Sequence, residues 1–337
     1  MPRCKPERRA DDQKRRILNR LLALLFTLLS LSASSAQAQE FPNRPLRIIT
    51  PYAAGGGIDL LTRTVAQRLG QFWNQQVIVE NRPGAGATIG YAAAAKAAPD
   101  GYTLVAAANP LGIGPVVYPN LAYDVHRDFM PIGLLATAPE VLTVTASSPY
   151  RSVADLVNAA KQTSRPQNFG SAGSGTLAHL AAESFNTAAN LNAQHVAYKG
   201  SSPALADLLG GQIDWIFDSP AAIMSNLQAG KLRALASAAP ERSPQLPTVP
   251  TMAEAGFPNL DFRIWLGLMA PAATPTTVIA QIETAIATIM KDPSLRKTLE
   301  GQGWDIAGTG AKSFEDFLKT ELPKLAQSAR AAKVKAD

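Results

Sequence analysis

The sequence predicts an α/β protein with two domains, and three observations carry this prediction. The chain has 337 residues, of which 46% are hydrophobic and 17% charged, so it can bury one large core or two modest ones. Short β-like apolar runs alternate along it with amphipathic helical stretches, which is typical of βαβ units. Turns rich in glycine and serine separate several predicted strands from the helices that follow them.

Residues 1–38 predict a secretory signal peptide. Basic residues up to Arg20 precede an apolar run over residues 21–31, and small residues then lead to a cleavage site after Ala38. The run has 11 residues, whereas a membrane-spanning helix needs about 20. Ordinary Sec export is the preferred interpretation. An uncleaved anchor remains an alternative, and so does twin-arginine export, because two arginines stand just before the run.

Cysteine and charge both separate this leader from the rest of the chain. The only cysteine, Cys4, lies in the leader, and export without any disulfide suits a bacterial periplasm, which is the predicted location. Residues 1–39 hold 8 Lys/Arg and 3 Asp/Glu and so account for most of the formal charge of +6. The other 24 basic and 23 acidic residues are scattered, which excludes an electrostatic nucleic-acid footprint.

The mature chain is predicted to begin with a strand at residues 46–50 and an amphipathic helix. Apolar residues from Ile58 to Phe72 recur there at helical spacing. Further strands are predicted at residues 77–79, 103–105, 213–217 and 234–236, and further helices at residues 88–96, 279–289 and 314–325.

Three turns rich in glycine and serine form the predicted binding site. In each, glycine lets backbone N–H groups approach a ligand, and the following helix N-terminus adds partial positive charge. One such turn is more often only structural, but three whose helix starts converge indicate an anion or carboxylate site. The turns span residues 51–59, 170–176 and 198–203.

The sequence lacks the motifs of the common catalytic and metal sites. It contains no G-x-S-x-G, no G-x-x-x-x-G-K-[ST] and no H-E-x-x-H. His179 and Glu183 stand four residues apart on a predicted helix, but one pair is not a metal site, and a local partner for the histidine is the expected arrangement. We therefore predict no catalytic residue, no metal and no cofactor.

Three further residues have roles that the sequence leaves open. Asp59 is expected to be a first-turn acid that favours the helix dipole rather than a base. Asp218 ends an apolar strand and is interpreted as contacting either the ligand or the crossing between domains. Trp265 is predicted on the opposite face of a short strand from Ile264, so it either packs in the core or borders the cleft.

An ordered set of motifs from Phe41 to the C-terminus resembles one known family. The motifs are P-Y-A-A-G-G-G-I-D, V-E-N-R-P-G-A-G-A-T-I-G, P-D-G-Y-T-L, S-A-G-S-G-T-L-A-H-L-A-A-E, V-A-Y-K-G-S-S-P-A-L-A-D-L-L-G-G-Q-I-D and G-K-L-R-A-L-A. In this order the chain resembles the Bug-type solute receptors, the extracytoplasmic substrate-binding components of tripartite tricarboxylate transporters.

The resemblance implies a two-lobed type II periplasmic-binding-protein fold, a Venus flytrap that closes on a ligand. It places lobe one at residues 40–140 plus 263–337 and lobe two at residues 141–262. It also implies that backbone groups of the first and third turns hold a ligand carboxylate, partly through water. The expected ligand-binding residues are Tyr52, Ala53, Ala54, Gly55, Gly56, Asn109, Ser171, Ser174, Gly175, Thr176, Lys199, Gly200, Ser201, Ser202 and Asp218.

The function that the resemblance implies is capture of a small organic carboxylate for the membrane subunits of a tripartite transporter. The receptor is expected to be a monomer. A receptor that signals to a membrane sensor kinase is the alternative, and neighbouring genes would separate the two. An enzyme on the same fold would need a nucleophile–base pair or a metal cluster, and the sequence shows neither.

Overall fold

The computed structural model describes residue 18 and residues 41–162 and 165–336. Apart from Leu18, the predicted signal peptide lies outside these ranges and stays a prediction. The described residues from Arg44 onward form one compact unit. Helices and strands alternate through that unit, so the predicted α/β class is confirmed.

The first group of strands contains the predicted N-terminal βαβ units. β1 (Leu46–Thr50) pairs in parallel with β2 (Val77–Asn81) on one side and β3 (Thr103–Ala107) on the other. The crossover helices are α2 (Gly57–Trp73) and α3 (Thr88–Ala95). The apolar face of α2 is buried as predicted except at Phe72, which is 47% exposed and meets the ring of Trp73 edge-on.

The second group of strands has its own hydrophobic core. Its strands are β5 (Asn168–Ser171), β6 (Gln194–Ala197) and β7 (Trp215–Asp218), and its helices are α6 (Val153–Gln162), α7 (Leu177–Ala188), α8 (Ser201–Leu209) and α9 (Pro220–Gln228). β5 pairs in parallel with both β6 and β7. In the core, Trp215 stacks on Phe169 with ring centroids 4.8 Å apart and meets Phe185 edge-on at 5.5 Å.

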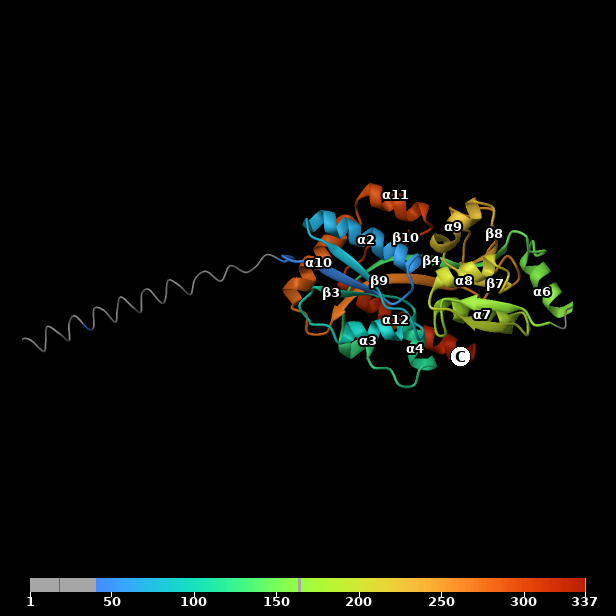
Figure 1. The fold of residues 1–337 in the computed structure, drawn as a ribbon, viewed down its shortest axis with the longest axis horizontal. Coiled ribbons are helices and arrows are strands. Elements are labelled where there is room, and N and C mark those ends of the chain that lie inside the picture. Colours follow the sequence, from blue (N-terminus) through green and yellow to red (C-terminus); the bar gives the residue numbers. More distant parts are fainter. Residues whose placement is uncertain (1–17, 19–40, 163–164, 337) are drawn as a thin grey trace, which may run out of the picture. The chain divides into compact units, whose positions relative to one another are not determined.

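Two long strands join the groups, as Figure 1 shows for β4 (Phe129–Thr145) and β9 (Arg263–Pro271). They are antiparallel to each other, and β9 also pairs with β3. From Glu140 onward β4 takes β8 (Leu232–Ala238) as its partner, and Val141 also pairs with β7. β4 runs in the same direction as β3 in the first group but opposite to β7 in the second. The carboxyl ends of the parallel strands in the two groups therefore face each other.

The remaining elements cover the first group and reach the second. They are α4 (Pro110–Val117), α5 (Val125–Asp128), α10 (Thr276–Ile289), α11 (Pro293–Gly301), β10 (Asp305–Ile306) and α12 (Ala311–Ala331). α12 packs with α4 and α7 in one cluster that includes Ile113, Leu177, Leu180 and Leu325. This cluster therefore ties the two groups together. Within the described ranges, no helix has the length and apolar character that crossing a bilayer requires.

Candidate ligand-binding site

A small cavity lies where the carboxyl ends of the two strand groups meet. Its volume is about 30 Å³, which holds one or two water molecules but no organic acid, so a ligand must widen it. It is lined by Tyr52, Gly56, Gly57, Ile58, Asn109, Glu140, Ala172, Thr176, Leu177, Ala178, Ser201, Asp218, Ser219 and Ile264.

Five helices begin at this cavity. α2, α4, α7, α8 and α9 follow β1, β3, β5, β6 and β7, and each contributes a cap or first-turn residue to the lining. At the starts of α2, α4, α8 and α9, no first-turn N–H donates a hydrogen bond to the side chain of the N-cap residue. Their N–H groups and the positive ends of their dipoles therefore favour a bound anion.

The first turn is held in shape by a buried acid. The side chain of Asp59 accepts hydrogen bonds from Gly55 N–H at 2.8 Å, from Arg63 at 2.9 Å and from the Asn81 amide at 2.7 Å. Asp59 is a first-turn residue of α2, as predicted. Its three partners fix the turn, so the glycines of that turn stay in one conformation.

The first and third turns touch each other. The N–H of Ala53 donates to the carbonyl of Lys199 at 3.1 Å, and the Ser202 hydroxyl donates to the carbonyl of Ala54 at 2.7 Å. Gly200 has φ of +151°, and a Cβ there would stand 2.9 Å from the Cβ of Ala53. A ligand carboxylate that used the Ala53 N–H would have to replace the bond to Lys199.

The second turn contains a pair that the sequence did not reveal. Ser171 Oγ lies 2.7 Å from His195 Nε2, and the His195 ring stacks on His179 with centroids 3.7 Å apart. A serine and a histidine at this distance are the geometry of a nucleophile and its base. However, Ser171 is 1% exposed, and its Oγ also accepts a hydrogen bond from Gly173 N–H, so the hydroxyl does not reach the cavity.

His179 has local partners, as expected, but it is buried. Its Nδ1 accepts a hydrogen bond from Gly175 N–H at 3.2 Å, and its Nε2 lies 3.7 Å from Glu183. No cluster of three or more metal-ligating side chains occurs in the described part of the chain. The histidine therefore supports the turn that precedes α7.

Two buried carboxyl groups line the cavity. Glu140 is 2% exposed, and its Oε2 has no hydrogen-bond partner among the described residues. Burial, together with the nearby Asp218, raises the pKa of Glu140 well above its usual value. Burial also raises the pKa of Asp218 to about 7, although Ser219 N–H and the Ser201 hydroxyl, at 2.8 and 2.9 Å, oppose the shift. Protonated carboxyls at these positions can donate hydrogen bonds to an anion.

Two further polar residues complete the lining. Tyr52 is buried, and this burial together with Glu140 raises the pKa of its hydroxyl far above the usual value. The Asn109 side chain donates to the carbonyl of Arg263 at 3.0 Å and accepts from Trp265 N–H at 3.1 Å. Asn109 therefore connects the start of α4 to β9 as well as facing the cavity.

Six of the expected ligand-binding residues line the cavity: Tyr52, Gly56, Asn109, Thr176, Ser201 and Asp218. The others lie around it. The side chain of Lys199 is exposed, and the carbonyl of Ser174 accepts a hydrogen bond from the Tyr118 hydroxyl at 2.9 Å. The lining also includes Gly57, Ile58, Glu140, Ala172, Leu177, Ala178, Ser219 and Ile264, which were not among them.

Glu140 carried a signal that sequence reasoning overlooked. It is the only charged residue between Phe129 and Thr145, in a run that is otherwise apolar or weakly polar. Burying a single acidic side chain in a strand costs folding free energy, so such a residue indicates a partner group or a ligand. Ser219 carried a weaker signal, because a serine before Pro220 marks a helix start.

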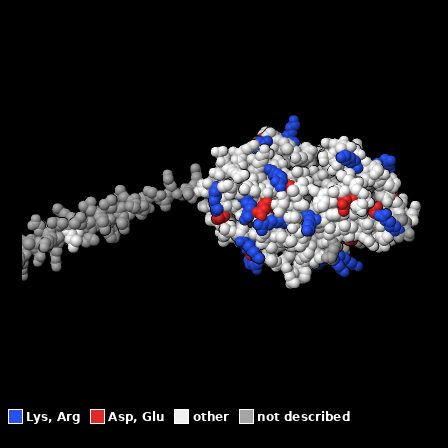
Figure 2. Space-filling view, viewed as in Figure 1, with Lys and Arg blue, Asp and Glu red and all other residues white. Residues whose placement is uncertain are grey.

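Surface charge agrees with a small-molecule site rather than a nucleic-acid surface. Figure 2 shows Lys/Arg and Asp/Glu side chains interspersed over the visible face of the described residues. Several form close pairs of opposite sign, such as Arg47 with Glu80 and Arg242 with Glu254. Such pairing leaves no continuous basic stripe on that face.

A family model described as "Tripartite tricarboxylate transporter family receptor" matches residues 61–331. Among curated proteins, the chain is 37% identical over 300 residues to "UPF0065 protein in tcbD-tcbE intergenic region" of Pseudomonas sp. (strain P51), with 88% of this chain and 89% of the relative covered. It is 31% identical over 313 residues to protein BugT of Bordetella pertussis, with 92% and 96% covered.

Solved structures that superpose on this chain include periplasmic binding proteins. Periplasmic binding protein BugD superposes with a TM-score of 0.84 at 30% identity, covering 88% of this chain and 100% of BugD. Rpa4515 of R. palustris, solved with adipate, gives 0.85 at 32% identity, covering 88% and 99%. MatC from Rhodopseudomonas palustris, solved with malate, gives 0.80 at 28% identity, covering 86% and 99%.

Proposed function

Since the chain belongs to the tripartite tricarboxylate transporter receptor family, we propose that its cleft captures a small organic carboxylate and presents it to the membrane subunits of a tripartite transporter. The two-lobed periplasmic-binding-protein fold is confirmed, and members of this family are periplasmic receptors. The observation that carries the proposal is the convergence of five helix N-termini on one cavity.

We propose that the lobes divide where β4 and β9 cross between the strand groups. β4 changes partner at Glu140, and β9 begins at Arg263, which supports lobe one at residues 40–140 plus 263–337 and lobe two at residues 141–262. The second group has a hydrophobic core of its own, which supports the same division. Closure then brings the five helix starts together around the ligand.

The proposed ligand class rests on the chemistry of the cavity. Backbone N–H groups at helix starts suit a carboxylate without requiring a cationic side chain, and the described lining has no Lys or Arg. The carboxyl groups of Glu140 and Asp218 face the same space and offer hydrogen bonds to a second polar group of the ligand. The adipate and malate found in the related structures are carboxylates of this kind.

We propose that the bound carboxylate leaves chemically unchanged. The close serine–histidine pair, Ser171 and His195, is kept from the cavity by the burial of the serine. The predicted signal peptide and the family support the proposed periplasmic location, and the family alone supports delivery to a transporter.

The test is a binding screen with purified protein. Succinate, malate and adipate are compared with the corresponding uncharged diamides by thermal shift and calorimetry, and the ligand is recovered for mass spectrometry. A carboxylate at a hundredfold excess over its Kd should stabilise the protein by about 2.7 kcal/mol, and its diamide should not. Equal binding of the diamides, or chemical conversion of the ligand at a catalytic rate, would contradict the proposal.

A further inference from the structure

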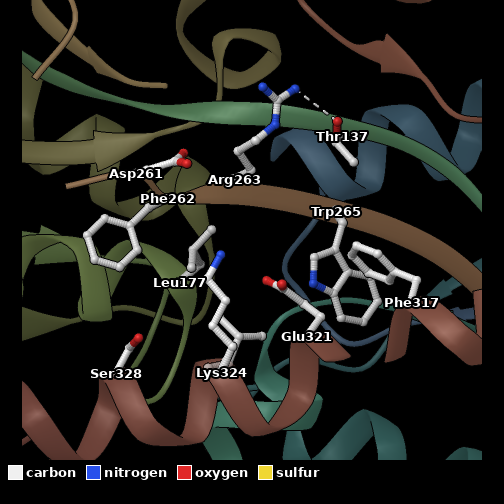
Figure 3. Close-up of a pocket in the computed structure, with 11 residues that line it drawn as sticks. Thr137, Leu177, Asp261, Phe262, Arg263, Trp265, Phe317, Glu321, Lys324 and Ser328 are labelled. Atoms are coloured by element: carbon white, nitrogen blue, oxygen red, sulfur yellow. Dashed lines mark hydrogen bonds between the residues drawn. The ribbon is translucent and has the colours of Figure 1, made fainter. Parts of the chain in front are cut away.

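A second and larger cavity lies between β9 and α12, outside the site described above. Its volume is about 180 Å³. Figure 3 shows its lining, to which Trp265, Phe262 and Phe317 contribute aromatic rings and Leu177 an aliphatic side chain. Leu177, the first residue of α7, borders both cavities. Leu177 is the only lining residue that the two cavities share among the described residues.

The indole of Trp265 is buried with its donor unused. The residue is 1% exposed, and its ring meets Phe314 and Phe317 edge-on at 5.8 and 5.6 Å. Its Nε1 has no hydrogen-bond partner in the described part of the chain. Figure 3 shows this nitrogen on the side of the ring that faces Glu321, and because the nitrogen is closed off from water, a ligand must displace a neighbouring side chain to reach it. A desolvated N–H is costly unless an acceptor occupies the cavity.

The same cavity also contains a hydrogen-bond acceptor. The half-buried carboxylate of Glu321, on α12, is also turned toward the interior in Figure 3. Burial and the nearby Asp261 raise the pKa of Glu321, although Lys324 lowers it. The cavity thus presents a donor, the indole N–H, and an acceptor, the carboxylate, to one small space.

The chemistry of this pair selects the ligand. A hydroxyl oxygen accepts from the indole N–H while its proton is donated to the carboxylate. The described lining carries two acids, Asp261 and Glu321, and two bases, Arg263 and Lys324, so its charges balance and favour an uncharged ligand. An ammonium group, moreover, has no lone pair for the indole. The aromatic walls favour a ring beside the hydroxyl.

We propose that this second cavity binds a small ring compound bearing a hydroxyl group, of the phenol class, with its oxygen between Trp265 Nε1 and the Glu321 carboxylate. The ring lies against Phe262 and Phe317. This proposal does not rest on the proposed carboxylate function, so either proposal can fail while the other holds.

The test follows the indole N–H signal of Trp265 in two-dimensional ¹H–¹⁵N NMR spectra of the whole protein. The signal is assigned by its loss in Trp265→Phe or, if that variant does not fold, by replacing each of the other three tryptophans. Phenol should shift it saturably, with a Kd on the order of 1 mM or below for so small a ligand. Anisole accepts but does not donate a hydrogen bond, so it should bind at least about tenfold more weakly.

Two matched variants identify the acceptor. Glu321→Met keeps the length of the side chain but removes the acceptor, so phenol should bind about as weakly as anisole. Glu315→Met, on the same helix but outside this cavity, should bind phenol like the wild type. Gly55→Val, in the carboxylate cleft, should also leave phenol binding unchanged.

Three results would overturn this proposal. The first is a Trp265 signal that high phenol concentrations do not shift, which would mean that only water fills the cavity. The second is equal affinity for phenol and anisole. The third is unchanged phenol affinity in Glu321→Met. None of them bears on carboxylate binding, which is measured separately.

Discussion

The backbone N–H of Ala53 donates a hydrogen bond to the carbonyl of Lys199 at 3.1 Å, so the first and third turns touch across the cleft. This backbone donor of the first turn is therefore already engaged by the protein itself. A ligand carboxylate that used it would exchange one hydrogen bond for another, charge-assisted one, and only the difference between the two would contribute to affinity.

Backbone geometry in the first turn should matter more than side-chain hydroxyls. Gly55 has φ of +87°, which strains a β-branched residue, and a Cβ there would stand 2.8 Å from Ser202 Oγ. Gly55→Val should therefore abolish carboxylate binding measured by calorimetry, whereas Ser201→Ala should weaken it only severalfold. The control is Gly230→Val, which has φ of +65° but open space around the Cβ. Equal and negligible losses in the two cleft variants would show that the turns are only structural.

Stability should depend on pH through Asp218. Burial raises its pKa to about 7 from an ordinary value of 3.8. Between about pH 4 and 7 the folded protein keeps a proton that the unfolded chain has lost, so the free energy of unfolding falls as pH rises through this window. Asp218→Asn removes this dependence, and its melting temperature relative to wild type should rise from pH 5 to 8 in calorimetry.

The comparison variant for this pH series is Glu241→Gln, at an exposed position. Its difference from wild type should stay constant. A constant difference for Asp218→Asn as well would mean that the buried acid does not hold the proton.

The same acid should discriminate between ligands. Asp218 faces the cavity, so a ligand with a hydroxyl or ammonium group can bond to it. Asp218→Ala should weaken binding of such a ligand by on the order of 1.5–3 kcal/mol, while a plain dicarboxylate should lose far less. Titrations of malate and succinate measure the affinity that each ligand loses in the variant. Equal losses of affinity for both ligands would show that Asp218 takes no part in ligand recognition.

A hydrogen bond between the two proposed lobes should affect closure. The Tyr118 hydroxyl, from proposed lobe one, donates to the carbonyl of Ser174, from proposed lobe two, at 2.9 Å. Tyr118→Phe removes this bond and so disfavours the closed form by about 0.5–1.5 kcal/mol. Small-angle scattering of the unliganded variant should show a larger radius of gyration, and affinity should fall by about two- to tenfold. An unchanged radius together with unchanged affinity would place this bond outside the closing motion.

Local features of the site were predictable from sequence, and contacts between distant segments were not. The turn before α2 follows from its glycines and Asp59, because both act within a few residues. The contact of Ala53 with Lys199 and the pairing of Ser171 with His195 depend on how separate segments pack. Periodicity predicts which face of an element is buried but does not identify what it meets.

The order of strands in the first sheet differs from their order in the chain. β9 lies between β3 and β4, although nearly half of the chain separates it from β3. Until residues 263–271 have been synthesised, β3 and β4 have no common neighbour, and the first sheet is incomplete with open edges. The second group, by contrast, is built largely from one continuous segment. Native closure of the first lobe is thus delayed until late in translation.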